Sequence, residues 1–166
     1  MKKRVRKLMF SSKSTEWNTP KNVFDTLNKR FGPFTLDAAA TKENTLCEQY
    51  YSLKEGRDGL NKKWRGMIFL NPPYGRGVVQ QWIAKAVHEV KKENCSQVCC
   101  ILPARTDTKW WHDLVVRYAS HIIFVRGRIK FNKGIEKPES APFPSVIVVF
   151  NHATDEGSAK YEMIKF

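Results

Sequence analysis

The sequence predicts an α/β fold in which a mostly parallel sheet carries helices on both faces. Two observations lead to this fold class. Short apolar runs at 67–70, 97–102 and 145–150 have the length and composition of strands that are buried on both sides. Segments with apolar residues at helical spacing lie between such runs, and strands that alternate with helices favour a parallel sheet.

The length of 166 residues is typical of one domain, and 42% apolar residues are enough for a folded core. We expect three parts along the chain: a basic, flexible tail at 1–14, a folded domain at 15–151, and a polar C-terminal tail at 152–166. The composition leaves the order of that last tail open.

The predicted elements begin with a helix at 21–30, whose apolar residues recur at helical spacing. Thr19 is its predicted N-cap, and Pro20 occupies the first helical position. Residues 34–37 are expected to form the first strand, which ends in Asp37 and three alanines. Such small residues allow a ligand or a helix to approach the backbone closely.

Less regular sequence follows, with a short helix predicted at 44–47, a strand at 49–52 and a loop at 58–60. The remaining elements are expected in this order: a strand at 67–70, a helix at 77–92, a strand at 97–102, a helix at 110–118, a strand at 121–125 and a last strand at 145–150. Ligands bind past the carboxyl ends of the strands in such folds.

The tetrapeptide Asn71-Pro72-Pro73-Tyr74 directly follows the predicted strand at 67–70. The Asn71 oxygen and the Pro72 carbonyl can each accept an N–H of an exocyclic amine, which draws the amine toward a tetrahedral, nucleophilic geometry. The prolines stiffen the loop and supply no competing amide donors, and Tyr74 offers a flat face for an extruded base. The tetrapeptide therefore indicates methylation of an amine such as N6 of adenine, with an ordinary stiff turn as the structural alternative.

Lysine and arginine outnumber aspartate and glutamate by 29 to 16, which gives a formal charge of +13. The usual partner of so basic a surface is a polyanion, and we favour nucleic acid over anionic lipid because no amphipathic basic helix stands out. No apolar run approaches the length of a membrane span, and no signal-peptide core follows the basic N-terminus. We therefore expect a cytoplasmic protein that does not bind membranes.

The four cysteines do not have the spacing of a metal site. Cys99 and Cys100 lie inside a predicted strand, where they resemble small core residues, and Cys47 and Cys95 stand alone. The four histidines are also scattered singly. We therefore expect reduced, structural thiols and no metal.

Six motifs occur in a consistent order along the chain. They are Trp17-Asn-Thr-Pro20, Leu36-Asp-Ala-Ala39, Asp58-Gly-Leu60, Leu70-Asn-Pro-Pro-Tyr74, Leu102-Pro-Ala-Arg105 and Gly127-Arg-Ile-Lys-Phe131. In this combination the chain resembles the phage-type DNA N6-adenine methyltransferases, a Dam-like family. The resemblance implies a minimal Rossmann-like class I methyltransferase domain with S-adenosylmethionine as cofactor and DNA as partner. A phage-encoded member would act in the cytoplasm of the host cell.

The resemblance also implies roles for individual residues. The catalytic element is implied to be Asn71, Pro72, Pro73 and Tyr74. Cofactor contacts are implied for Trp17, Thr19 and Pro20 over the methionine moiety, for Asp37, Ala38 and Ala39 near its methionine end, for Asp58 at its adenine amine, and for Asn71. The chain lacks the Gly-x-Gly of many methyltransferases at this point. The structural alternatives are a helix cap for Asp37, a core anchor for Trp17 and a turn for Asp58.

Basic side chains interleaved with an aromatic residue near 126–133 suit a nucleic-acid surface. The resemblance implies that Phe131 faces a flipped adenine opposite Tyr74. A solvated basic loop with Phe131 in the core is the alternative. The predicted DNA contacts are Tyr74, Arg105, Lys109, Arg126, Arg128, Lys130 and Phe131.

Other acceptors remain open at this point. N4 of cytosine, an RNA base and a protein glutamine pose the same chemical problem as N6 of adenine, and RNA has a 2′-hydroxyl that loops could recognise. Methylation at C5 of cytosine is disfavoured because it needs a cysteine after a proline, and the chain has no Pro-Cys pair. A basic DNA-binding module without catalysis is the alternative from another class.

Overall fold

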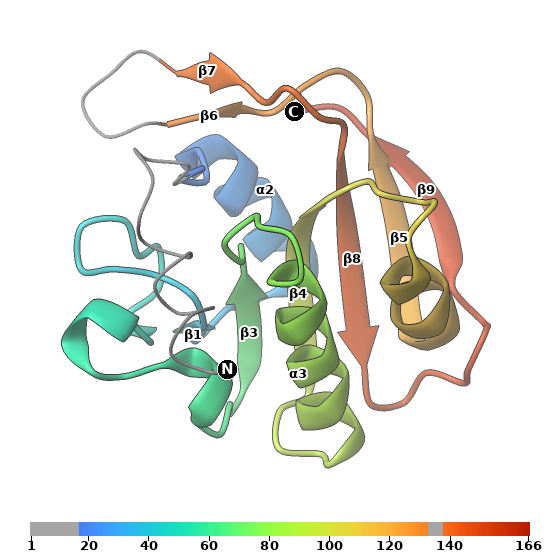
Figure 1. Cartoon of the computed structure of the whole chain (residues 1–166), viewed down its shortest axis with the longest axis horizontal. Coiled ribbons are helices and arrows are strands. Elements are labelled where there is room, and N and C mark those ends of the chain that lie inside the picture. Colours follow the sequence, from blue (N-terminus) through green and yellow to red (C-terminus); the bar gives the residue numbers. More distant parts are fainter. Residues whose placement is uncertain (1–16, 133–137) are drawn as a thin grey trace.

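The computed structural model describes residues 17–132 and 138–166, so the predicted tail at 1–14 lies outside the described residues. Its centre is a seven-stranded sheet (Figure 1). The strands of this sheet are β1 (Leu36–Asp37), β2 (Gln49–Tyr50), β3 (Met67–Leu70), β4 (Gln97–Pro103), β5 (Ala119–Val125), β8 (Ser145–Asn151) and β9 (Lys160–Ile164). Across the sheet they lie in the order β2-β1-β3-β4-β8-β5-β9. A separate ribbon of β6 (Lys130–Phe131) and β7 (Glu139–Ser140) lies beyond the end toward which β3 points (Figure 1).

The sheet is mostly parallel, as predicted. Four of its six strand pairings are parallel: β1 with β2, β1 with β3, β3 with β4, and β5 with β9. The strand β8 runs antiparallel to both β4 and β5. The chain reaches β8 from β5 through the ribbon, and a strand that returns without a helical crossover lies antiparallel to the one before it.

The two α-helices of the described residues bury their apolar faces in two different clusters of the core. Helix α3 (Val79–Lys91) packs with Cys100 of β4, whereas α2 (Lys21–Phe31) packs with Cys99 of the same strand. The π-helical segment η3 (Trp111–Val116) joins the α3 cluster. Because β4 is buried along its whole length, its sequence reads as a continuous apolar run.

Two predictions near the start of the chain are wrong. Residues 44–47 contain no helical residue, and the Asn44 side chain accepts the N–H of Thr41 at 2.7 Å in a turn there. Thr19 does not cap α2. The N-cap residue is Pro20, and the Thr19 hydroxyl accepts a hydrogen bond from the side chain of Asn71 instead.

Two further differences concern a loop and a strand. The predicted loop at 58–60 is a short 3₁₀ turn, η2 (Gly59–Asn61), and Asp58 caps it by accepting the N–H of Leu60 at 3.0 Å; a second such turn, η1 (Leu53–Glu55), precedes it. The strand at 145–150 is not the last, because β9 pairs in parallel with β5 at the sheet edge. In the part of the chain that the structure describes, no helix is long and apolar enough to cross a membrane.

Candidate active site

The site forms where the carboxyl ends of β1 and β3 lie side by side. The two strands are parallel, and Asp37 at the end of β1 is in register with Phe69, two residues before Asn71. The predicted tetrapeptide therefore begins at the first residue beyond β3, beside the end of β1. Pro72 is buried and Pro73 is half-buried, so the loop is packed into the protein.

The side-chain amide of Asn71 is held on both sides. Its Nδ2 donates to the Trp17 carbonyl at 2.6 Å and to the Thr19 hydroxyl at 3.0 Å. Its Oδ1 accepts a hydrogen bond from the Tyr74 hydroxyl at 2.7 Å. A carbonyl can only accept, so the contact with Trp17 fixes which side of the amide carries the nitrogen. The Asn71 oxygen therefore faces Tyr74.

The Tyr74 hydroxyl has a choice of two acceptors. It lies 2.7 Å from Asn71 Oδ1 and 3.1 Å from the Ile101 carbonyl of β4, and it has a single proton to donate. Burial of the hydroxyl end raises the pKa of Tyr74 well above its usual range. The phenol is therefore a neutral donor rather than a base.

Four aromatic rings pack against one another beside Asn71. Tyr74 contacts Phe131 and Phe143 edge to face, with ring centroids 6.4 and 5.3 Å apart, and Trp17 contacts the same two rings at 5.7 and 5.6 Å. Phe131 is fully buried, as in the structural alternative of a core residue. The geometry thus brings Trp17, Tyr74 and Phe131 together, while their predicted contacts with a cofactor or a base stay predictions.

The segment that carries Trp17 and Thr19 is tied to the ribbon. The backbone of Asn18 pairs with that of Asn132 through two hydrogen bonds of 3.1 and 2.9 Å, and the Asn18 side chain accepts from Asn44 Nδ2 at 2.8 Å. Sequence reasoning missed these three asparagines and Phe143. Asn18 lies inside the motif Trp17–Pro20, and Asn132 directly follows the motif Gly127–Phe131. This closeness to the motifs is the feature of the sequence that could have indicated them.

Asp37 is buried at the end of β1 with 4% of its surface exposed. Burial raises the pKa of its carboxyl to about 7, and hydrogen bonds from the backbone of Ala39 and Leu46 offset this only in part. The contact with the Ala39 N–H is long, at 3.4 Å. The carboxylate is therefore short of donors and is suited to a cationic partner.

The turn at Asp58 is packed against the end of β1. A Cβ at Gly59 would lie 2.1 Å from the carbonyl oxygen of Ala38, so this close approach requires glycine. Asp58 Oδ1 accepts from the Leu60 N–H at 3.0 Å, and Oδ2 accepts from Asn61 Nδ2 at 2.9 Å. The predicted contact of Asp58 with an adenine amine stays a prediction. Ala38 is fully buried.

The basic residues predicted to bind DNA are all exposed. Arg105 and Lys109 follow β4, and Lys109 lies 3.9 Å from Asp113 in a solvated pair. The other three, Arg126, Arg128 and Lys130, follow β5, at the same edge of the sheet as Asn71. Their DNA contacts stay predictions. Pro20 and Ala39, both implied at the cofactor, are half-buried.

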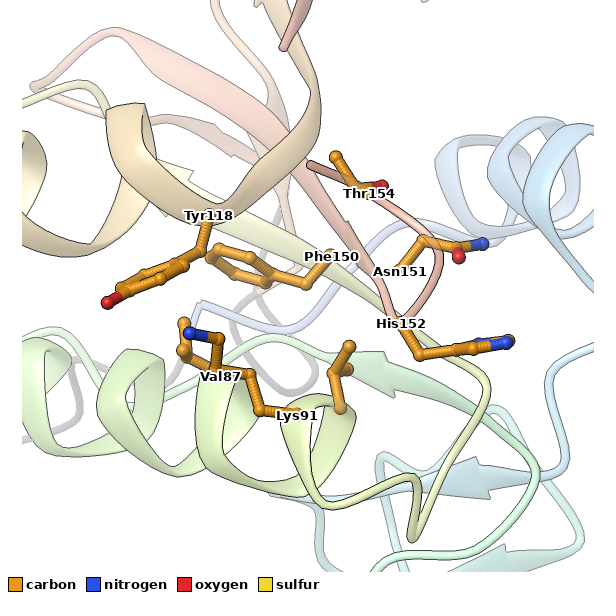
Figure 2. Close-up of a pocket in the computed structure, with 8 residues that line it drawn as sticks. Val87, Lys91, Tyr118, Phe150, Asn151, His152 and Thr154 are labelled. Carbon is orange, nitrogen blue, oxygen red and sulfur yellow. The ribbon is translucent and has the colours of Figure 1, made fainter. Parts of the chain in front are cut away.

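A hollow elsewhere in the molecule is too small for a cofactor. Figure 2 shows this cavity of about 40 Å³, which is lined by residues such as Lys91, Tyr118 and Asn151. Asn151 pairs with Gln97 at the start of β4, so the cavity lies at the opposite edge of the sheet from Asn71. Its volume suits one or two water molecules. The described residues include no cluster of three His, Cys, Asp or Glu side chains able to hold a metal ion, and the four cysteines are free.

Comparison with proteins of known name gives two relatives. Over 112 residues the chain is 35% identical to the DNA N-6-adenine-methyltransferase of Escherichia phage T1, an alignment that covers 66% of this chain and 44% of the phage protein. The chain thus spans less than half the length of that relative. It is also 36% identical over 66 residues to the candidate methyltransferase YfdM of Escherichia coli (strain K12), which covers 36% of this chain and 70% of that protein.

A solved structure and a family complete the comparison. The crystal structure of a predicted O-methyltransferase from Agrobacterium tumefaciens is 16% identical and has a TM-score of 0.31, over 60% of this chain and 39% of that one. A likeness this low carries no argument about the fold. The family match is far more extensive, since it spans residues 8–163. By that match, and with the Asn71–Tyr74 loop in place beyond β3, the chain belongs to the DNA N-6-adenine-methyltransferase (Dam) family.

Proposed function

We propose that this protein transfers the methyl group of S-adenosylmethionine to the N6 amine of adenine in DNA. The observation that carries the proposal is the oriented amide of Asn71, which has its nitrogen bound to Trp17 and Thr19 and its oxygen on the other side. Family membership supports the same reaction. A Rossmann-like class I arrangement of the domain belongs to this proposal, and the mostly parallel sheet supports it.

The protein acts on the amine through acceptors. The oxygens of Asn71 and of the Pro72 backbone each take one N–H, so the nitrogen lone pair is drawn out of conjugation with the ring. The Tyr74 proton can turn to the Ile101 carbonyl, which frees a lone pair on Asn71 Oδ1 for the incoming amine. The cofactor supplies an electrophilic methyl group on a positively charged sulfur. As the new N–C bond formed, the bond between the methyl group and the sulfur would break, the sulfur would become neutral, and the amine would release its surplus proton to solvent.

The residues beside Asn71 fit such a cofactor. Asp37 is a buried carboxylate with a raised pKa and few donors, and a cation is the partner that such a group lacks. Ala38 and Ala39 directly after it carry only methyl side chains, which lets a ligand lie close to the backbone. Asp37 would hold the charged methionine end, and Asp58 would accept from the adenine amine.

The proposal for DNA rests on charge. The chain carries +13, and exposed basic residues flank the site after both β4 and β5. An adenine must leave the duplex to reach Asn71, and unstacking is then offset by contacts with aromatic rings. The four rings fill the space beside Asn71, so a base stacked on Tyr74 or Phe131 requires them to separate.

The test is transfer of labelled methyl from S-adenosylmethionine to unmethylated duplex DNA, followed by digestion and separation of the nucleosides. We expect the label in N6-methyladenine. Label in N4-methylcytosine, in RNA or in a protein glutamine would contradict the proposed acceptor and retain the amine chemistry. Cofactor binding without transfer to any of these would contradict the proposed reaction. No cofactor binding would indicate a basic DNA-binding module.

A further inference from the structure

Thr19 contacts the Asn71–Tyr74 loop through its side chain. Its hydroxyl lies 3.0 Å from Asn71 Nδ2, and the cofactor contact implied for this residue stays a prediction. The residue is 8% exposed, and it precedes α2 without capping the helix. The side chain of this buried threonine therefore serves Asn71, 52 residues further along the chain.

We infer that Thr19 is a positioning residue, whose hydroxyl holds the amide of Asn71 so that Oδ1 faces the amine to be methylated. The inference rests on the proposed function. The Trp17 carbonyl accepts a hydrogen bond from one N–H of Nδ2, and the Thr19 hydroxyl accepts a hydrogen bond from the other. With both protons engaged, the amide is fixed against rotation about its last bond and against the reversed orientation.

The two donated hydrogen bonds also change the acceptor. An amide nitrogen that donates hydrogen bonds releases electron density to its oxygen, because the two ends are conjugated, and hydrogen bonds in such chains strengthen one another. Oδ1 then attracts the N–H of the substrate more strongly. Without the Thr19 hydroxyl, one Nδ2 proton would be left in a part-buried place without its partner, and the amide would gain freedom to turn.

The segment itself is held rigidly enough for this role. Asn18, between the two acceptors, pairs with the backbone of Asn132 and accepts from Asn44. The ring of Trp17 packs against Phe131 and Phe143. Thr19 is thus fixed from the ribbon side, while Asn71 is fixed from β3. The Thr19 hydroxyl therefore joins the segment before α2 to the loop after β3, which lies 52 residues further along the chain.

The test compares Thr19→Val, which removes the hydroxyl and keeps the shape, with Thr19→Ser, which keeps the hydroxyl. We expect Thr19→Val to lower kcat about tenfold and to leave the cofactor Kd within about twofold, since one hydrogen bond is lost from the positioning of Asn71. Thr19→Ser should restore most of kcat. Thr26→Val is the matched control, because Thr26 donates to the Asn22 carbonyl on the exposed side of α2.

Three results would overturn the inference. They are an unchanged kcat in Thr19→Val, a loss of cofactor affinity as large as the loss of kcat, and no recovery in Thr19→Ser. If Thr19→Val does not fold, Thr19→Ala takes its place in the same comparison. Absence of methyl transfer by the unmodified protein would count against the proposed function instead. In that case the unfolding free energies of Thr19→Val, Asn71→Ala and the double variant still decide, since coupled residues give non-additive changes and additive changes would overturn the inference.

Discussion

Asn71 and Asp37 lie at the ends of neighbouring parallel strands, yet their polar groups are in opposite situations. The Asn71 amide has partners for both its nitrogen and its oxygen, at 2.6 to 3.0 Å. The Asp37 carboxylate is buried with a 3.4 Å contact and a pKa raised to about 7. The first group is oriented by the protein itself, whereas the second is left short of donors.

In the proposed function, this difference separates two tasks in one site. The acceptor of the amine must be in place before the substrate arrives, because reorganising it during the reaction would cost free energy. A carboxylate that awaits a cation can instead be stabilised by that ligand on binding. We therefore expect changes at Asn71 to affect turnover and changes at Asp37 to affect cofactor binding and stability.

The largest expected effect is that of Asn71→Ala. Loss of the oriented oxygen should lower kcat by about 10²- to 10³-fold, as for other acceptors and donors placed at a reacting group. The cofactor Kd should stay within about twofold, because Asn71 acts on the amine. Steady-state kinetics and calorimetry measure the two quantities. Asn22→Ala on the exposed face of α2 is the control, and equal losses of kcat and cofactor affinity in Asn71→Ala would erase the contrast with Asp37.

Asp37→Asn should weaken cofactor binding and stabilise the folded protein. The cofactor Kd is expected to rise at least about tenfold, because the cation loses its charged partner. The unfolding free energy at pH 8 is expected to rise by about 1–3 kcal/mol, because a buried charge is removed. Asp25→Asn is the control, since Asp25 pairs with Lys21 in solvent. If chemical denaturation shows that Asp37→Asn is less stable than the unmodified protein, the Asp37 carboxylate has enough hydrogen-bond donors in the folded state.

The pH dependence follows from the raised pKa of Asp37. The stability contribution of this group is fully present below the ordinary aspartate pKa of 3.8 and is lost as pH rises through the folded-state pKa of about 7, so the stability gain of Asp37→Asn should appear across that window. Cofactor affinity should instead increase as the pH rises. A cation favours the ionised carboxylate, so lowering the pH from 8 to 6 should weaken binding about tenfold in the unmodified protein. The same titration should be flat in Asp37→Asn, and a slope retained there would assign the proton to another group.

The smallest expected effect concerns the exposed basic residues that follow β4 and β5. Changes there should alter neither turnover nor cofactor binding. Arg128→Ala should weaken DNA binding about threefold near 0.1 M salt and lower the slope of log K against log salt by about 1. Turnover at saturating DNA and the cofactor Kd should not change. Fluorescence titrations at several salt concentrations measure the slope. A slope unaltered by the substitution would remove Arg128 from the DNA surface.

Much of the fold could be predicted because the helices and the buried strands have a periodic signal or a continuous apolar run. The apolar runs that became β3, β4 and β8 are buried strands, and the helical spacing at 21–30 and 77–92 predicts α2 and α3. The strand β9 was not predicted because it lies in the segment 152–166, whose composition is polar overall. As an edge strand β9 leaves Tyr161 and Met163 exposed, so it lacks the apolar run of a buried strand.

The sequence predicted where the tetrapeptide lies in the fold, but it did not predict the tertiary contacts of its side chains. The tetrapeptide was expected beyond a strand, and it lies there. The partners of the Asn71 amide are 52 and 54 residues away, and no local pattern joins them. The burial of Phe131 also depends on the ribbon and Trp17 packing together. Tertiary contacts of this kind decide which atoms of a motif are already bonded.

The position of β8 in the sheet has a consequence for the order in which the strands can pair during synthesis. The strands β4 and β5 are neighbours only through β8, which lies between them and comes last of the three in the chain. During synthesis, both would wait with open edges until residues 145–151 leave the ribosome, and open edges recruit other strands. The residues at the ends of β1 and β3 are made early, but the sheet beneath them closes late. A chain that ends before Ser145 would therefore contain the whole tetrapeptide but would lack β8, the strand that joins β4 to β5.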